Sequence, residues 1–389
     1  MGLLFIPFYL KILGLESYGL IGLFAVLQVC LGILNVGMSP TLGREMARFN
    51  GGALSRIELK NLLRSIEVLA LSIALLNIII VYFIAEWLSK SWLNLGELSV
   101  DTARYAISIM GVVLGVKLFE SIYRSALIGL QKQVAFNFAN ALLSTIRGGG
   151  AILVLSIYSP SIENFFIWQV LVSLASVLSF KILTVKFIGK TSDRSRFSLD
   201  ALRKIKKFAG GMFGISIVTV LITQIDKIIL TKYLSLHDYG NFTLVATLAG
   251  ILFVLVGPIN QAIYPRLCTL VASGKKDQQI EYFHKGSQLV TLVVGSAGIF
   301  GMFFAEEILY FWTTNIELAK NSSTILVFLL MGNLLNTFVH MPGRLQIANG
   351  VTKVGFVINI ISLFIVIPLL LYSVPRYGVN GAIFTWVLL

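Results

Sequence analysis

Two cationic side chains lie near the middle of two consecutive long apolar segments. Lys117 falls within residues 103–127, and Arg147 falls within residues 137–158. If these segments are membrane helices they run antiparallel, so the two cations are expected at the same depth. A charged side chain at the centre of a bilayer costs about 2.5–3.5 kcal/mol on insertion scales and therefore faces protein or a wet cavity. The pair is the leading candidate site for binding an anion.

A carboxylate and a further arginine share the helix face of the first cation. Lys117, Glu120 and Arg124 are spaced i, i+3 and i+7, which places them on one side of a helix. Glu120 can form a salt bridge with either Lys117 or Arg124, and the cluster is then an internal ladder that lets a polar helix pack. Three cations share this single carboxylate, however, and an anionic substrate would supply the missing negative charge. Both interpretations remain open.

Two pairs of arginines recur at similar positions in the two halves of the chain. Arg124 recurs as Arg344, and Arg44 recurs approximately as Arg266, each at an expected cytoplasmic end of a helix. Because arginine binds phosphate in a bidentate manner, these side chains are candidates for guiding an anionic head group into a central cavity. The alternative is that they only fix the orientation of the helices.

The remaining buried acid is Asp226, beside Lys227 near the outer end of a span. Its carboxylate could bind a proton or a sodium ion that drives a transport cycle, or it could pair with the neighbouring lysine. Cys30 and Cys268 are far apart, and the histidines occur singly, so neither a metal site nor another cofactor is expected.

The elements that position these residues follow from composition. Hydrophobic residues make up 57% of the 389 residues and charged residues only 13%, against about 25% charge in soluble domains. We expect an all-α integral membrane protein, because the apolar runs are long enough for helices and too long for barrel strands. Ten complete spans are predicted, at 18–41, 63–88, 103–127, 137–158, 164–188, 208–231, 240–264, 286–305, 323–342 and 354–373. Two further helices, at 1–13 and from about Gly378, are expected to be clipped, which gives about twelve.

The net charge of +13 is unevenly distributed along the chain. Most lysines and arginines fall in the loops of one side, including the basic segment 190–207. The positive-inside rule therefore places both termini of the complete chain in the cytoplasm. Topology and anionic lipid explain this excess, so no nucleic-acid partner is expected.

The chain also contains an internal repeat. Leu13-Gly-Leu-Glu-Ser-Tyr-Gly19 returns as Leu234-Ser-Leu-His-Asp-Tyr-Gly240, a shift of 221 residues. Six spans separate equivalent points, so the copies enter the membrane in the same direction. Parallel repeats of this kind place a substrate site between two halves. We expect an N-terminal six-helix lobe at 1–189, a basic cytoplasmic linker at 190–207 and a C-terminal six-helix lobe at 208–389, arranged around a central cavity.

The repeat favours a transporter over a static scaffold. The loops are too short for a nucleotide-binding or soluble catalytic domain, so the chain is not expected to be an enzyme. Energy would come from an ion gradient, the membrane potential or the gradient of the substrate.

Four motifs carry a resemblance to a known family. They are the first heptapeptide, Pro40-Thr-Leu-Gly-Arg-Glu-Met-Ala-Arg48, Gly129-Leu-Gln-Lys132 and Gln224-Ile-Asp-Lys227. With these motifs the chain resembles polysaccharide biosynthesis flippases, the Wzx-type O-antigen translocases of the multidrug/oligosaccharidyl-lipid/polysaccharide exporter superfamily. The resemblance covers essentially the whole chain.

This resemblance implies a fold like that of MATE exporters, with two six-helix lobes around a cationic lumen. It implies a substrate in which an oligosaccharide is linked to undecaprenyl diphosphate, turned from the cytoplasmic to the periplasmic leaflet of a bacterial inner membrane. The diphosphate would meet Lys117 and Arg147, while the polyprenyl tail would stay among membrane lipids.

Two other functions compete with this one. A cation-coupled drug exporter of the same superfamily would be expected to carry acidic residues in its lumen, whereas the deep charges here are mainly basic. A membrane-embedded glycan polymerase or ligase would be expected to have a large periplasmic loop, and the outer loops here are short.

Overall fold

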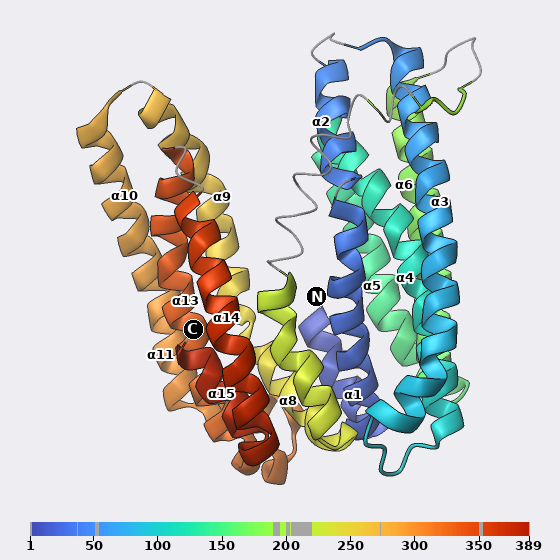
Figure 1. The fold of residues 1–389 in the computed structure, drawn as a ribbon, viewed down its shortest axis with the longest axis vertical. Helices are drawn as coiled ribbons and strands as arrows, with labels where there is room; N and C mark the ends of the chain where they lie inside the picture. The colour runs from blue at the N-terminus through green and yellow to red at the C-terminus, as the bar shows by residue number, and fades with distance from the viewer. Residues whose placement is uncertain are drawn as a thin grey trace. The chain divides into compact units, whose positions relative to one another are not determined.

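The computed structural model describes residues 2–36, 38–50, 54–189, 195–199, 203, 220–272, 274–349 and 353–388. Across these ranges the regular secondary structure is helical, and no β-strand occurs (Figure 1). Nine of the described helical stretches are long and apolar enough to cross a membrane. The predicted all-α membrane class is therefore confirmed, and the helix count is consistent with about twelve spans. Of the predicted span 208–231, the structure describes only the second half, residues 220–231, which is helical.

The helices pack as two compact units, Met1–Gln224 and Ile225–Leu389. The boundaries expected from the sequence differ from this division at residues 208–224, of which the structure describes only 220–224. The lobes 1–189 and 208–389, and the linker 190–207, stay predictions.

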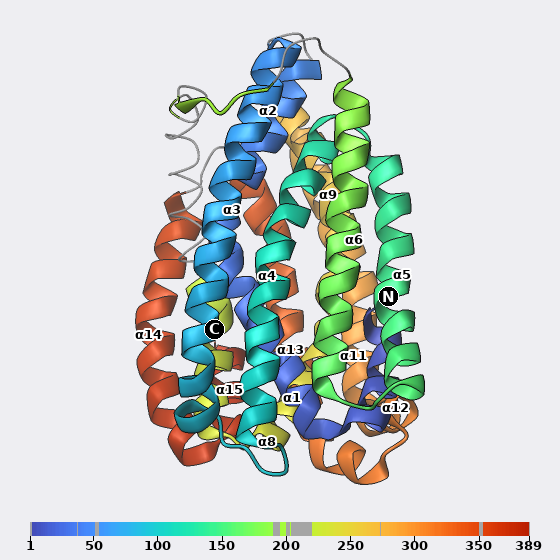
Figure 2. The same ribbon diagram turned by 90° about the vertical axis from the view of Figure 1, so that its right-hand side faces the viewer.

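A single helix organises the first unit. The helices of this unit are α1 (Gly2–Val36), α2 (Ser39–Asn50), α3 (Arg56–Trp87) with a short π-helical extension η1 (Leu88–Trp92), α4 (Val100–Gly129), α5 (Gln133–Ile157) and α6 (Ile162–Ile188). Helix α4 packs against α1, α2, α3, α5 and α6, and Figure 2 shows it between α3 and α6. Close packing depends on glycine, because a Cβ on Gly111 would lie 2.8 Å from the Cβ of Val81. Because α4 contacts every other long helix of this unit, side chains that line a site in the unit are expected on α4.

Helix α3 shows why these sequences form long membrane helices. Ser55 caps its N-terminus, where the Ser55 Oγ accepts from the Glu58 amide at 3.3 Å and a Glu58 carboxylate oxygen accepts from the Ser55 amide at 2.9 Å. Along the helix, Leu71, Leu75 and Phe83 are exposed apolar side chains. A helix with an exposed apolar face and satisfied backbone bonds is suited to contact with lipid.

The second unit repeats this plan. In this unit residues 225–233 are helical and precede α8 (Leu236–Ala249), α9 (Ile251–Ala272), α10 (Lys276–Val290), η2 (Thr291–Gly295), α11 (Ser296–Phe303), α12 (Ala305–Thr313), α13 (Ile316–Ala348), α14 (Lys353–Tyr377) and α15 (Val379–Leu388). Helix α13 packs against α8, α9, α10, α11, α12 and α15. It therefore occupies in this unit the central place that α4 has in the first, and the recurring arginines Arg124 and Arg344 lie on these two helices.

The repeated heptapeptide lies at the start of a long apolar helix in each unit. In the first copy, Gly14 has a φ of 78° and breaks α1, so that residues after it begin the main span. Glu16 is buried and accepts three backbone N–H bonds, from Gly96 and Glu97 at 2.7 Å and from Leu98 at 3.1 Å. These bonds fix the loop between η1 and α4 to the start of the span.

The second copy begins its helix in a different way. Ser235 caps α8, and its hydroxyl accepts from the Asp238 amide at 3.0 Å. His237 stands 221 residues after Glu16 and is exposed. The two copies thus share their position but not their contacts.

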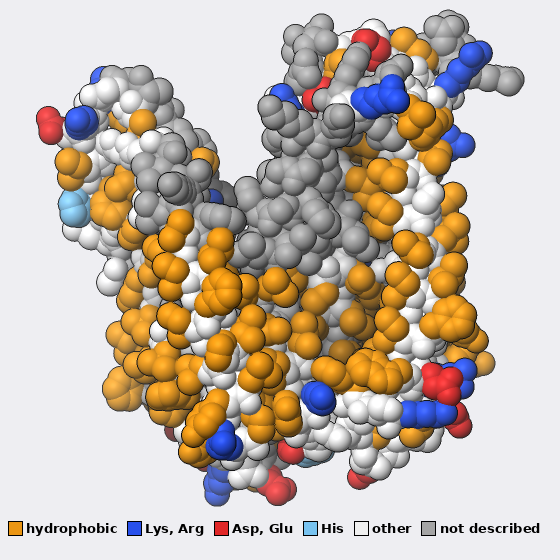
Figure 3. All heavy atoms as spheres, in the orientation of Figure 1, with side chains coloured by type: hydrophobic (Ala, Val, Ile, Leu, Met, Phe, Trp, Pro, Cys, Tyr) orange, Lys and Arg blue, Asp and Glu red, His pale blue; other side chains and the backbone are white. Residues whose placement is uncertain are grey.

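Surface chemistry agrees with a membrane environment. On the face drawn in Figure 3, hydrophobic side chains cover the visible sides of the C-terminal helices, whereas lysine, arginine and acidic side chains lie near the helix ends. An apolar belt with charged ends is what a bilayer requires of a helical bundle.

Candidate functional site

A polar cavity lies within the first unit, between α1, α3 and α4. Its volume is about 220 Å³. The polar side chains that line it are Gln28, Asn77, Lys117, Glu120, Ser121 and Arg124. Four of these come from α4, and for three of them, Lys117, Glu120 and Arg124, the sequence predicted a shared helix face. Below, we refer to this cavity as the N-unit cavity.

Glu120 connects the cavity to the second deep cation. The Arg147 Nη2 donates to Glu120 Oε2 at 3.0 Å and to the Ser176 hydroxyl at 3.3 Å, which joins α5 to α4 and α6. Both charged side chains are mostly buried, with 21% of Arg147 and 17% of Glu120 exposed. The Ser176 hydroxyl in turn donates to the Val172 carbonyl at 2.8 Å. Arg147 is therefore held behind the cavity by its carboxylate partner and is absent from the cavity lining.

The other two cations of the cluster form no salt bridge in the part of the chain that the structure describes. The salt bridges of the described helices include neither Lys117 nor Arg124. Arg124 is exposed, and its guanidinium lies 5.4 Å from the centre of the Phe136 ring. Glu120 is already bonded to Arg147. The lining therefore carries positive charge without a matching acid, which favours an anion.

Asn77 is a lining residue that the sequence reasoning missed. It comes from α3, is 5% exposed, and its Oδ1 accepts no hydrogen bond from the described residues. A buried amide oxygen without a donor is uncommon in folded proteins, and here it lines the same cavity as Lys117. In the sequence, Asn77 could have been identified as the single amide side chain within the apolar run 63–88.

The other arginines singled out from the sequence lie elsewhere. Arg44 on α2 and Arg266 on α9 are both exposed, and Arg344 on α13 lines a separate cavity in the second unit. The expectation that these residues and Arg124 guide an anionic head group into a central cavity stays a prediction, since they belong to both units.

Asp226 has an incomplete set of partners. Its Oδ1 lies 4.0 Å from Lys227 Nζ and is buried without a hydrogen-bond donor in the described part of the chain. Both interpretations of this acid, a lysine partner and an ion-binding group, therefore remain open. Among the described residues, no group of three His, Cys, Asp or Glu side chains is placed to hold a metal ion.

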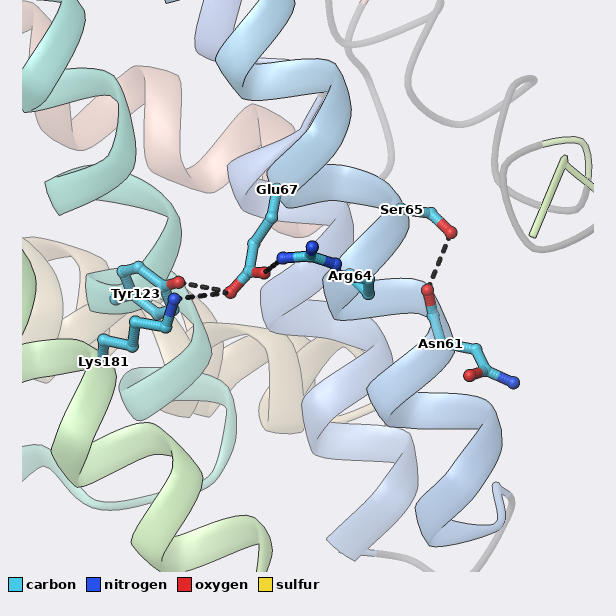
Figure 4. A network of polar contacts seen from close by, with 6 residues as sticks. All are labelled: Asn61, Arg64, Ser65, Glu67, Tyr123 and Lys181. Carbon is cyan, nitrogen blue, oxygen red and sulfur yellow. Dashed lines mark hydrogen bonds and ion pairs between the residues drawn. The ribbon is translucent and has the colours of Figure 1, made fainter. Parts of the chain in front are cut away.

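Glu67 is an acid within the predicted span 63–88 that the sequence analysis did not single out. Figure 4 shows Glu67 of α3 surrounded by three donors: the Tyr123 hydroxyl donates to Glu67 Oε1, Arg64 Nη1 lies 3.3 Å from Oε2, and Lys181 Nζ lies 3.8 Å from Oε1. This carboxylate is saturated with partners from α3, α4 and α6. It ties three helices together rather than presenting a free group to a ligand. Its signal was an ionisable residue within a predicted span.

The same part of α3 holds the segment 195–199. The Ser198 amide donates to the Ser65 hydroxyl at 2.8 Å, and the Arg196 amide donates to Asn61 Oδ1 at 2.7 Å. The Ser65 hydroxyl also bonds the Asn61 carbonyl at 2.7 Å, as drawn in Figure 4. Part of the predicted basic linker is thus docked on the first unit.

Solved structures with a similar fold include two transporters. An inward-facing multidrug resistance MATE family transporter of the MOP superfamily matches with a TM-score of 0.75 and 14% identity over 99% of this chain and 89% of that chain. The lipid II flippase MurJ in an inward closed conformation gives the same TM-score and identity over 99% of this chain and 82% of that one. These likenesses confirm the predicted MATE-like fold.

Sequence comparisons agree with this fold. A protein of Shigella flexneri named "Putative O-antigen transporter" is 23% identical over 96% of this chain and 87% of its own length. A MatE model matches residues 212–371, and the model described as polysaccharide biosynthesis protein matches residues 1–271. The latter match covers more than half of the chain, and the chain therefore belongs to the polysaccharide biosynthesis protein family.

Proposed function

We propose that this protein is a flippase for an oligosaccharide linked to undecaprenyl diphosphate. It would move the lipid from the cytoplasmic to the periplasmic leaflet of a bacterial inner membrane by alternating access of two six-helix lobes. The relative from Shigella flexneri is named as an O-antigen transporter, and MurJ is named as a lipid II flippase, which supports a substrate of this class.

The observation that carries the proposal is the charge of the N-unit cavity. Lys117 and Arg124 lie in a membrane-spanning helix and form no salt bridge with the described residues, and Glu120, the acid among the described lining residues, is bonded to Arg147. Such an arrangement is costly unless a ligand or water compensates the charge. A diphosphate offers several acceptor oxygens and more than one negative charge, and both lysine and arginine bind phosphate well.

We propose different roles for the three cations. Lys117 and Arg124 contact the diphosphate directly, whereas Arg147 reaches it by exchanging its bond to Glu120 for a bond to phosphate. The apolar exterior of α3 allows the polyprenyl tail to remain in lipid while the head group crosses. Arg44, Arg266 and Arg344 draw the head group from the cytoplasmic side by long-range attraction.

Coupling to an ion gradient is assigned to Asp226. Its buried Oδ1 has no hydrogen-bond donor among the described residues, so a proton or a sodium ion can satisfy it. In this proposal both termini of the complete chain face the cytoplasm, in agreement with the distribution of basic residues between spans.

A cation-coupled multidrug exporter is the second candidate, because a multidrug MATE transporter has a similar fold. The lining of the N-unit cavity argues against a cationic drug, since two cations and one already paired acid would repel it. A lipid with an anionic head group is the better match.

Reconstituted vesicles provide the test. Lipid-linked oligosaccharide extracted from cells that lack this protein is placed in one leaflet, and its appearance in the other leaflet is measured. Lys117→Ala and Arg147→Ala should each reduce translocation more than tenfold, whereas Lys90→Ala, which removes an exposed pair with Glu86, should have no effect. Wild-type rates in the double variant Lys117→Ala/Arg147→Ala would refute the proposal, as would failure of the wild-type protein to translocate the lipid.

A further inference from the structure

A second polar cavity lies within the C-terminal unit, between α9 and α13. Its volume is about 240 Å³, and we refer to it as the C-unit cavity. The side chains that line it are Phe253, Val256, Asn260, Tyr264, His340 and Arg344, together with Gly257. Below about 300 Å³ a cavity is smaller than those that hold drug-sized ligands, so its occupant is a small group.

The internal repeat relates the two cavities. Arg344 stands 220 residues after Arg124, and both arginines line the cavity of their own unit. The same offset relates Glu120 to His340, so that an imidazole stands where the first cavity has its carboxylate. An offset of 221 residues relates Gly32 to Phe253, which adds an aromatic ring. Compared with the N-unit cavity, the C-unit cavity therefore has fewer charged and more aromatic side chains in its lining.

The aromatic side chains of the C-unit cavity are arranged around its polar groups. The rings of Phe253 and His340 are stacked, with an interplanar angle of 23° and centroids 6.1 Å apart. The guanidinium of Arg344 lies 5.7 Å from the centre of the Tyr264 ring. Flat apolar faces beside hydrogen-bonding groups suit a ligand that has both C–H faces and hydroxyl groups.

Asn260 supplies an unused hydrogen-bonding group. Its Nδ2 lies 3.2 Å from His340 Nδ1, while its Oδ1 is buried and has no partner among the described residues. The side chain is only 5% exposed. Whichever way the amide is turned, one of its ends contacts His340 and the other end has no partner. Asn333 of α13 differs, because it donates to the Ala249 carbonyl and accepts from Trp386, so both of its ends are used.

We propose that the C-unit cavity binds one sugar ring of the glycan, through a hydroxyl or N–H group bonded to Asn260 and a hydroxyl bonded to Arg344. Phe253 and Tyr264 offer their rings to the C–H face of the sugar. This inference rests on the proposed function, in which the N-unit cavity binds the diphosphate. It assigns binding of the carbohydrate to the C-unit cavity.

Two lipids separate the contributions of sugar and diphosphate. One probe is the lipid-linked oligosaccharide extracted from cells that lack this protein, and the other is undecaprenyl diphosphate without a glycan. Binding of each probe to the full-length protein in nanodiscs is measured for Asn260→Leu and Phe253→Leu. Asn359→Leu is the matched control, since it removes an exposed amide of α14 that lines neither cavity. The thermal unfolding temperature of each variant reports whether it is folded.

We expect Asn260→Leu to weaken binding of the glycan-bearing lipid about tenfold, which is the loss of one hydrogen bond, and to leave binding of undecaprenyl diphosphate unchanged. Phe253→Leu should show the same selectivity even if Asn260→Leu fails to fold. Equal losses for both probes would mean that the cavity binds phosphate, and unchanged binding of both would mean that it binds neither; each result overturns the inference. Failure of the wild-type protein to bind either probe would instead refute the proposed function.

Discussion

Replacement of Glu120 by glutamine should weaken the fold and tighten the binding of the anion. The substitution keeps the size of the side chain but removes the negative charge that the described residues contribute to the lining of the N-unit cavity. Arg147 then loses its carboxylate partner at 3.0 Å, although its bond to Ser176 can remain. The same change frees Arg147 to meet a phosphate group and removes a charge that repels the ligand.

The burial of the Arg147–Glu120 pair determines the expected loss of stability, and the distance between Glu120 and the ligand determines the expected gain in affinity. Exposed ion pairs contribute about 0–1 kcal/mol, and disruption of fully buried pairs costs about 3–5 kcal/mol. With 21% and 17% of the two side chains exposed, this pair lies between these limits, and we expect the free energy of unfolding to fall by about 2 kcal/mol. Two unit charges about 6 Å apart at an effective dielectric constant of about 40 interact by about 1.4 kcal/mol, so undecaprenyl diphosphate should bind about tenfold more tightly.

Purified protein in detergent allows both quantities to be measured. Thermal unfolding with and without undecaprenyl diphosphate gives the change in stability, and titration gives the dissociation constant. Glu281→Gln is the control, because Glu281 forms an exposed pair with Lys285 and should change neither quantity measurably. A folded Glu120→Gln variant that bound undecaprenyl diphosphate more weakly than the wild type would show that Glu120 does not compete with the ligand, and the charge argument would be wrong.

Three further predictions concern single side chains. Glu16→Ala removes the acceptor of three backbone hydrogen bonds and should lower the free energy of unfolding by about 3 kcal/mol, measured by thermal unfolding. His237→Ala in the second heptapeptide is the control and should change the free energy of unfolding by less than about 0.5 kcal/mol. Asn77→Leu should leave stability unchanged or raise it by about 1 kcal/mol, because an unpartnered buried amide is removed, while titration should show weaker binding of undecaprenyl diphosphate. Asp226→Asn should abolish the dependence of vesicle transport on pH or sodium, and a retained dependence would exclude Asp226 as the coupling residue.

The fold was largely predictable because the bilayer leaves few alternatives. Long apolar runs must be helices, and the heptapeptide repeat predicted two related halves. The sequence did not show that α4 and α13 would each pack against most helices of their unit. The sequence predicted separate helices at 1–13 and 18–41, and the non-helical Gly14 within α1 lies at that boundary. It also did not predict the π-helical segments η1 and η2.

The candidate site was only partly predictable, because helical spacing relates residues within one helix and not between helices. Lys117, Glu120 and Arg124 share a face for that reason. The choice of Arg147 as the partner of Glu120 depends on how α5 packs against α4, whereas helical spacing offered only Lys117 and Arg124. Asn77 was missed because whether an amide is satisfied depends on its neighbours in space.

The bonds to Glu16 also bear on how the chain is inserted during synthesis. Their donors follow Glu16 by 80 to 82 residues, so at about 5–20 residues per second the ribosome needs about 4–16 s to supply them. Until then the carboxylate has no backbone donors, and α1 cannot be locked in place. These bonds can form only if the loop before α4 emerges on the same side of the membrane as the start of the main span in α1. A nascent chain with α3 inserted in the wrong direction could not make these bonds, so the contact that holds the finished unit also selects for its correct insertion.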